Sequence, residues 1–248
     1  MPHAYDFDTA FAPRPAARKA PSPSGTLDSR FRDFIASEDF PCVGSKLALA
    51  RDGLHTREFA PLGDVSNDGP LLDALAGFVA MLDERDADDR SVDSLVALFR
   101  GPRSMDEAAF ERQLWNQLQR LHELDLARGN TWAADVERDP DSPRFSMSLA
   151  GHPFFVIGLH PGASRIARRF EAPVLVFNSH RQFNRLREDG RFAKMQQATR
   201  ARDIALQGSI NPNLSDYGQA SEARQYSGRA VDAGWRCPFR ATGPEDAA

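Results

Sequence analysis

The sequence has few cysteines and no long apolar run. Cys42 and Cys237 stand far apart, so we expect neither a disulfide framework nor a four-ligand zinc site. No apolar stretch approaches the length of a membrane span, and the first residues carry Asp6, Asp8 and several prolines in place of a secretory signal. These absences predict a soluble protein of the cytoplasm, without a membrane partner.

Several common functional signatures are also missing. The net charge is −4, which argues against generic nucleic-acid binding because phosphate contacts need a clustered basic excess. There is no glycine-rich loop ending in Gly-Lys-Ser/Thr and no G-x-G-x-x-G after a strand, so ATP and NAD binding are not supported. The nucleophile elbow G-x-S-x-G and the zinc motif H-E-x-x-H are absent as well.

The composition predicts one main domain with a tail at each end. Residues 1–25 are rich in Pro, Ala and Ser and poor in periodic apolar positions, which is typical of a disordered segment. We therefore expect a folded domain over residues 26–240 and a flexible tail over 241–248. A chain of 248 residues is long enough for a substantial core.

Helical spacing of apolar residues recurs in three places. Thr26 can cap a first helix that carries Leu27 and Phe31, and a second helix is predicted over 71–82. Ser104 and Glu107 suggest a capping box for a third helix, with a stop at Gly129.

Strand patterns lie between and after these helices. The run at 95–99 favours a buried strand, 145–149 and 152–160 form a predicted hairpin, and 174–177 predicts another strand. A helical pattern over 183–195 is interrupted at Gly190, and the chain is irregular from Gln207 onward. We therefore expect an α+β fold, a single domain whose mainly antiparallel or mixed sheet is flanked by helices, with a long irregular C-terminal segment.

The segment GLHPGASRIARRF is the first candidate for a site. His160 stands at the end of a predicted strand, and Arg165, Arg168 and Arg169 follow it. A neutral imidazole can bind iron, and guanidinium groups suit the carboxylates of haem or of an anionic substrate. The alternative is a histidine that hydrogen-bonds a turn beside a solvated basic helix.

Two other histidines and the two cysteines could also serve as iron ligands. His180 ends the run VFNSH, and His152 precedes Pro153. Either histidine could be a distal or alternative ligand, although the following proline makes His152 better explained as a turn residue. Cys42 or Cys237 could supply a thiolate, the axial ligand that favours O–O cleavage, or could be buried as a small apolar residue.

Three stretches carry a resemblance to a known family: HPFFVIGLHPGASRIARRF, APVLVFNSHRQFNRLREDGRFAKM, and the run from 200 to 239 that contains NPNLSDYGQASEARQYSGRAVDAGWRCPF. Together they resemble the YqcI/YcgG family over Phe145–Phe239, with a weaker extension around Cys42. The resemblance implies haem-dependent N-hydroxylation of arginine or another guanidino compound. Where family members often read NPML, this chain has Asn213, which could alter substrate preference.

The resemblance places the histidine of GLHP at His160 and that of NSH at His180. It implies a monooxygenase with haem b as iron cofactor, dioxygen as co-substrate, and an external reductase or ferredoxin. His160 is the first choice for the proximal ligand, with His180 and Cys237 as alternatives.

Further roles follow from this expected chemistry. Arg165, Arg168, Arg169 and Arg202 are expected to pair with the propionates, whereas His180, Asp216 and Glu222 are expected in the catalytic site, the two acids binding a cationic substrate. The rival hypotheses are a haem-binding or haem-sensing protein without turnover and a metal-free binder of small anions. The oligomeric state is not predicted.

Overall fold

The structure is a computed structural model, and it describes residues 25–85, 91–216 and 218–243. Most of both predicted tails, residues 1–24 and 244–248, lies outside the described residues. Within them no helix is long and apolar enough to cross a membrane.

A five-stranded mixed sheet runs through the centre of the domain in the order β1-β2-β5-β4-β3. Its strands are β1 (Leu54–Phe59), β2 (Ser94–Phe99), β3 (Met147–Leu149), β4 (His152–Leu159) and β5 (Val174–Ser179). β1 and β2 are parallel, and every other neighbouring pair is antiparallel. The predicted α+β class with a mixed sheet is confirmed.

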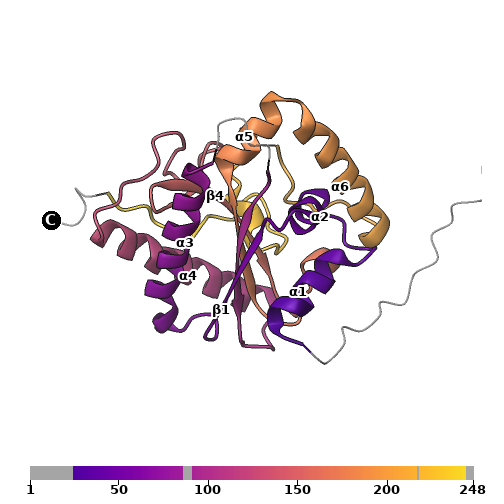
Figure 1. The fold of residues 1–248 in the computed structure, drawn as a ribbon, viewed down its shortest axis with the longest axis horizontal. Coiled ribbons are helices and arrows are strands. Elements are labelled where there is room, and N and C mark those ends of the chain that lie inside the picture. Colours follow the sequence, from indigo (N-terminus) through magenta and orange to yellow (C-terminus); the bar gives the residue numbers. More distant parts are fainter. Residues whose placement is uncertain (1–24, 86–90, 217, 244–248) are drawn as a thin grey trace, which may run out of the picture.

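Helices cover both faces of this sheet (Figure 1). In the view of Figure 1, α3 (Asp68–Asp83) and α4 (Glu107–Ala127) lie on one side, and α1 (Leu27–Ala36), α2 (Val43–Ala50) and α6 (Arg191–Gln207) lie on the other. The remaining helical elements are α5 (His180–Glu188), α7 (Ala223–Tyr226) and two short 3₁₀ turns, η1 (Val65–Asn67) and η2 (Ile166–Arg168). Each face has its own apolar cluster.

The central strand β2 shows why the sequence reads as a continuous apolar run. Leu95, Ala97 and Phe99 belong to the cluster under α3 and α4, whereas Val96 and Leu98 belong to the cluster under α1 and α2. Because successive side chains alternate between faces, a strand that is covered on both sides needs apolar residues at every position. The predicted strand is confirmed at Ser94–Phe99.

Of the two predicted helix N-caps, one is confirmed and one is wrong, and the helical pattern predicted over 183–195 extends further, from His180 to Gln207 with a break at Gly190. Thr26 Oγ1 accepts from the Ser29 amide at 3.1 Å and caps α1 as predicted. The predicted capping box from Ser104 is wrong, because Asp106 is the cap of α4: its Oδ1 accepts from the Ala109 amide at 2.7 Å. Asp106, two residues closer to the helix than Ser104, is the N-cap residue in its place.

Two turns depend on left-handed backbone conformations. Ala150 and Gly151, at φ 53° and 65°, form the tight turn of the predicted β3–β4 hairpin. Gly190, at φ 73°, separates α5 from α6, as the interruption of the helical pattern predicted. Beyond α6 the described chain is irregular except for α7, and Ala223, Tyr226 and Phe239 of this segment pack in the core under α4.

Candidate functional site

A cavity of about 320 Å³ lies between the sheet and the layer formed by α1, α2, α5 and α6. The strands contribute alternate residues to its floor: Ser94 and Val96 of β2, Phe155, Ile157 and Leu159 of β4, and Val176 and Asn178 of β5. Side chains two positions apart on a strand share one face, so these residues form a continuous, mainly apolar surface. A concave surface with an apolar floor is typical of a small-molecule site.

His180 stands at the wall of this cavity, at the first position of α5. Its side chain is 2% exposed, and Nδ1 lies 3.9 Å from Glu222 Oε2. Burial, with a smaller contribution from the Arg187 guanidinium, lowers the pKa of His180 to about 4. The imidazole is therefore uncharged at neutral pH, which is the form that binds iron.

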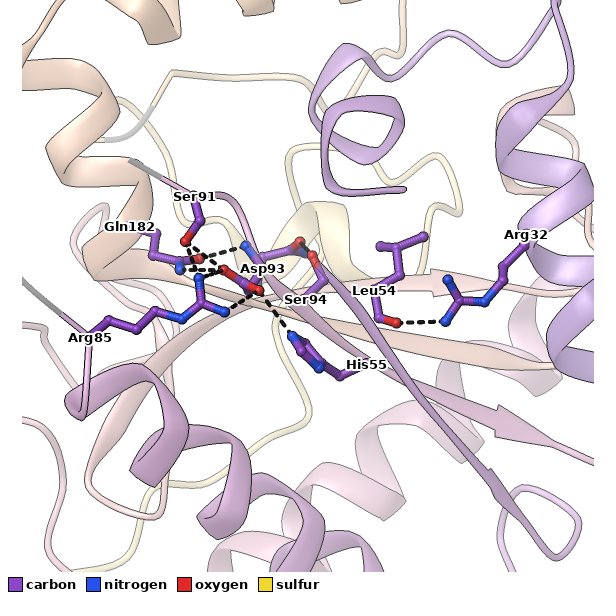
Figure 2. Close-up of polar contacts among 9 residues, drawn as sticks. Arg32, Leu54, His55, Arg85, Ser91, Asp93, Ser94 and Gln182 are labelled. Atoms are coloured by element: carbon purple, nitrogen blue, oxygen red, sulfur yellow. Dashed lines mark hydrogen bonds and ion pairs between the residues drawn. The ribbon is translucent and has the colours of Figure 1, made fainter. Parts of the chain in front are cut away.

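The start of α5 is held by a buried carboxylate, Asp93, shown in Figure 2. The Asp93 amide donates to Gln182 Oε1 at 3.1 Å, and Gln182 Nε2 donates to Asp93 Oδ2 at 3.3 Å. Arg85 binds both carboxylate oxygens, at 2.9 and 2.8 Å, and Ser91 and His55 add contacts of 2.8 and 2.9 Å. Asp93 thus joins β1, β2, the end of α3 and the helix that presents His180.

Two of the four predicted arginines line the cavity, but both are bound to other protein groups. Arg165 donates to the Asp203 carboxylate and to the Ser209 carbonyl, the latter at 2.9 Å. Arg168 donates to the carbonyls of Gly158, Tyr226 and Gln225, at 2.9, 3.2 and 3.1 Å. Burial lowers the pKa of Arg168 to about 10, so it stays charged at neutral pH.

The other two predicted arginines lie elsewhere. Arg169 donates to the backbone oxygens of Ala163 and Ser164, and Arg202 donates to the backbone oxygen of Glu38. Neither arginine is among the described residues that line the cavity. Arg169 and Arg202 therefore lie outside the cavity lining.

Sequence reasoning missed two arginines that do line the cavity. Arg200 on α6 pairs with Asp216 at 2.6 Å, and Arg187 on α5 donates to Asn184 and lies with its guanidinium 4.6 Å from the centre of the Phe192 ring. Both belong to the helical stretch after VFNSH, whose many arginines were the available signal.

Of the two predicted acids, Asp216 lies at the edge of the cavity and Glu222 lies inside it. The side chain of Asp216 is 48% exposed, and hydrogen bonds from Arg200 and Gln196 lower its pKa. Glu222 is buried, with 6% of its surface exposed, next to His180. The structure thus brings three of the predicted site residues, His180, Asp216 and Glu222, to one cavity.

His160, the first choice for the iron ligand, lies on the opposite side of the sheet. Leu159 faces the cavity, so the next residue faces away, and the His160 ring stacks on Phe110 of α4 with ring centres 4.3 Å apart. Burial lowers the pKa of His160 to about 4, and a backbone hydrogen bond at Met105 offsets part of this effect. His160 is therefore uncharged at neutral pH, but it does not line the cavity.

The two cysteines also lie on opposite faces. Cys237 packs against the core under α4, away from the cavity, and burial raises the pKa of its thiol to about 12, which disfavours a thiolate. Cys42 lines the cavity, where its Sγ accepts from the Ser45 amide at 3.4 Å and caps α2. His152, the remaining histidine candidate, hydrogen-bonds Ser179 at 2.8 Å.

A bare metal ion finds no obvious site in the described part of the chain. No group of three or more His, Cys, Asp or Glu side chains there could hold one. Haem differs from a bare ion because the macrocycle supplies four nitrogen ligands, so a single protein side chain is enough.

The structure is that of a mixed α+β protein with a cavity between its sheet and one helical layer. The chain belongs to the YqcI/YcgG family, whose model matches residues 31–240. This match confirms the resemblance seen in the sequence and extends it over α1–α4. No curated protein and no solved structure matches the chain.

Proposed function

We propose that this protein is a haem-dependent monooxygenase that N-hydroxylates a guanidino or amino group of arginine or of an arginine-like small molecule. The observation that carries the proposal is His180, a buried, uncharged imidazole at the wall of a mainly apolar cavity. The expectation of N-hydroxylation comes from the resemblance to haem-dependent family members. A cytoplasmic location and an external reductase or ferredoxin are part of the same proposal.

The residues that are present fit haem in three respects. His180 offers the neutral imidazole that haem iron binds, and the floor of Phe155, Ile157 and Val176 offers apolar contact for a macrocycle. Arginine side chains at the cavity, Arg165 and Arg200 among them, suit carboxylates in fork geometry. Both histidines are uncharged, so the position of His180 in the cavity lining is what favours it over His160 as the axial ligand.

Bound haem supplies the activation of dioxygen, with electrons from the external donor. The chain's own residues bind, orient and exclude water. His180 would hold the iron from α5, whose start is anchored on Asp93. The arginines would hold the propionates, and α6 would cover the site, since Met195, Gln196 and Thr199 face the cavity from that helix.

The cationic end of the substrate has one accessible acid in the described cavity. Asp216 is half-exposed and is bound by Arg200 and Gln196. A substrate guanidinium would compete with Arg200 for this carboxylate, because both present the same planar donor fork. Asp216 is therefore our proposed substrate contact at the cavity edge.

Haemin titration of the purified protein tests the proposal, with ferric, ferrous and ferrous-CO spectra recorded for each variant. We expect stoichiometric haem in the native chain, loss of the axial histidine signature in His180→Ala and His180→Gln, and retention in His160→Ala, a matched control for a buried histidine on the other face. Cys237→Ala should also retain it. Absence of stoichiometric haem in the native chain would overturn the proposal and favour the metal-free anion binder.

Turnover separates the enzyme from a haem-binding or haem-sensing protein. With haem, dioxygen and a reductant, arginine and related guanidino compounds should gain one oxygen atom, detected by mass spectrometry. A protein that binds haem and CO but transforms none of these compounds would support the sensing alternative.

A further inference from the structure

The helix α6 lies over one side of the cavity without being packed into the core. It has 17 residues and none of them is buried, whereas each of the helices α1 to α5 buries at least one residue. Phe192 and Met195 of α6 line the cavity, and Ile204 is 45% exposed. Because helices in proteins are stabilised mainly by burial of an apolar face, the core contributes little to the position of α6.

Two side chains on the outer part of α6 hold it to neighbouring segments. Arg202 donates to the Glu38 carbonyl at 2.8 Å, and Gln207 accepts from the Ile166 amide at 2.8 Å and donates to the Ser164 carbonyl at 3.4 Å. We call these the outer contacts of α6, because neither Arg202 nor Gln207 is among the described residues that line the cavity. Water can replace either partner of such hydrogen bonds, so their net contribution to stability is small.

Two further contacts of α6 lie at the cavity itself. Thr199 Oγ1 accepts from the Val43 amide at 3.1 Å, and the Asp203 carboxylate accepts from Arg165. Like the outer contacts, these bonds join side chains of α6 to other segments. The helix can therefore leave its neighbours without breaking its own backbone hydrogen bonds.

A glycine in the left-handed conformation stands at each end of α6. Gly190 has φ 73° and Gly208 has φ 76°. An added Cβ would meet no atom of the described chain within 4 Å at either position, so the backbone conformation, and not a lack of space, favours glycine there. Hinges are typically a few residues at the ends of elements that absorb changes in φ and ψ. The helix is thus bounded by two positions about which it can turn.

The other walls of the cavity are anchored more firmly. The floor is the central sheet, and α5 buries three residues. The start of α6 is joined to α5 through the rings of Phe192 and Phe183, whose centres are 6.0 Å apart. Movement is therefore expected in the C-terminal half of α6, with Gly190 as the pivot.

We propose that α6 is the lid of the cavity: it turns about Gly190, releases Arg202 and Gln207 from their partners, and so lets a ligand enter and leave. Segments with few buried apolar contacts open locally far more often than the core, and active-site lids are drawn from such segments. The inference concerns access to the cavity and holds for whatever ligand the cavity binds.

A cysteine on the cavity floor measures the opening without a bound ligand. Val176 lies on β5, the middle strand of the sheet, and lines the cavity. The thiol of Val176→Cys should react with a bulky neutral maleimide at a rate proportional to the open fraction, as long as reclosing is faster than labelling. Peptide mapping by mass spectrometry separates this thiol from those of Cys42 and Cys237.

Two double variants, both made in the Val176→Cys chain, test the outer contacts. Arg202→Ala with Gln207→Ala removes these contacts, and Lys194→Ala with Gln197→Ala is the matched control, because it removes the same charge from exposed positions of the same helix. Loss of a hydrogen bond shifts an opening equilibrium by about two- to tenfold, so labelling at position 176 should be about tenfold faster without the outer contacts. In the control it should stay within about twofold of the parent rate. Equal labelling rates in the two double variants would overturn the proposal.

Haemin, the ligand of the proposed function, gives a second readout in the same variants with Val176 restored. A lid controls both entry and exit, so the association and dissociation rate constants of haemin should rise together without the outer contacts, and Kd should be nearly unchanged. A helix that only contacted the ligand would alter mainly the dissociation rate constant, and that result would refute the lid. A protein that binds no haemin would contradict the proposed function alone, because the labelling experiment needs no haem.

Discussion

Replacing Asp93 by alanine should destabilise the domain and disturb the cavity together. The Asp93 side chain is 2% exposed and accepts from Arg85 through both oxygens, as well as from Ser91, Gln182 and His55. Truncation leaves these donors without their shared acceptor in a buried place. Figure 2 shows how they converge on this one carboxylate.

The magnitude follows from the burial of the partners. Removing one member of a buried ion pair costs about 3–5 kcal/mol. Here the Arg85 side chain is 29% exposed, so water can replace part of its interaction and the lower end of that range applies. We therefore expect Asp93→Ala to lose about 3 kcal/mol of unfolding free energy, and Asp93→Asn, which keeps an acceptor oxygen, to lose about 1–2 kcal/mol.

Urea denaturation followed by circular dichroism measures these losses. Asp73→Ala is the matched control, because Asp73 pairs with Arg128 at the surface, where the two side chains are 68% and 37% exposed, and such pairs contribute about 1 kcal/mol or less. Since Gln182 connects Asp93 to α5, haemin affinity should fall in Asp93→Ala and remain unchanged in Asp73→Ala. An Asp93→Ala protein as stable as the control would refute the reasoning.

Three other predictions concern packing, hydrogen bonding and charge. Gly158→Ala on β4 would place a Cβ atom 2.6 Å from a ring carbon of Phe110 on α4, so we expect urea denaturation to show a loss of about 1–3 kcal/mol of unfolding free energy. Gly77→Ala on α3 has no atom within 4 Å of its Cβ and should gain about 0.5–1 kcal/mol. Equal effects of the two substitutions would contradict the packing argument. In Arg168→Lys the lysine ammonium cannot reach all three carbonyls that the guanidinium binds, so we expect a loss of about 1–3 kcal/mol of unfolding free energy. Arg169→Lys, at a more exposed site, should lose less. The reverse order of the two losses would contradict this role of Arg168. Burial raises the pKa of Glu222 to about 8, and an ionised carboxylate in the cavity would repel the propionates of a bound haem, so haemin affinity of the native chain should fall above about pH 8 and that of Glu222→Gln should not; parallel titration curves would contradict this expectation.

The regular elements of this domain were largely predictable, because a strand covered on both faces and amphipathic helices leave clear patterns. Two of the longer elements were missed, α2 (Val43–Ala50) and β1 (Leu54–Phe59), as was the single turn of α7 (Ala223–Tyr226). In β1 only the two end residues, Leu54 and Phe59, are buried, so an edge strand of this kind shows no alternation. α2 has eight residues and a single buried position, Ala48, which is too little for a helical pattern.

The cavity was harder to predict than the fold, because it is assembled from segments far apart in the chain. Arg200 and Asp216 are close in sequence, but their position against the strand residues Val96 and Ile157 depends on how α6 folds back over the sheet. Local spacing contains no information on that packing. Arg169 and Arg202 were therefore wrongly assigned to the site, because Arg169 is bound to the backbone of its own loop and Arg202 to the backbone of Glu38.

The choice between the two histidines depends on strand parity. On β4 the cavity is lined by Phe155, Ile157 and Leu159, so His160, one residue further, falls on the other face. On β5 it is lined by Val176 and Asn178, and the same two-residue step reaches His180. Both strands are apolar on both faces, so the sequence alone could not reveal which parity faces the helices of the cavity. A shift of β4 by one residue would bring His160 to the cavity face, and a shift of β5 by one residue would remove His180 from it. The matched pair His180→Ala and His160→Ala therefore distinguishes a ligand in the cavity from the ligand that the sequence favoured.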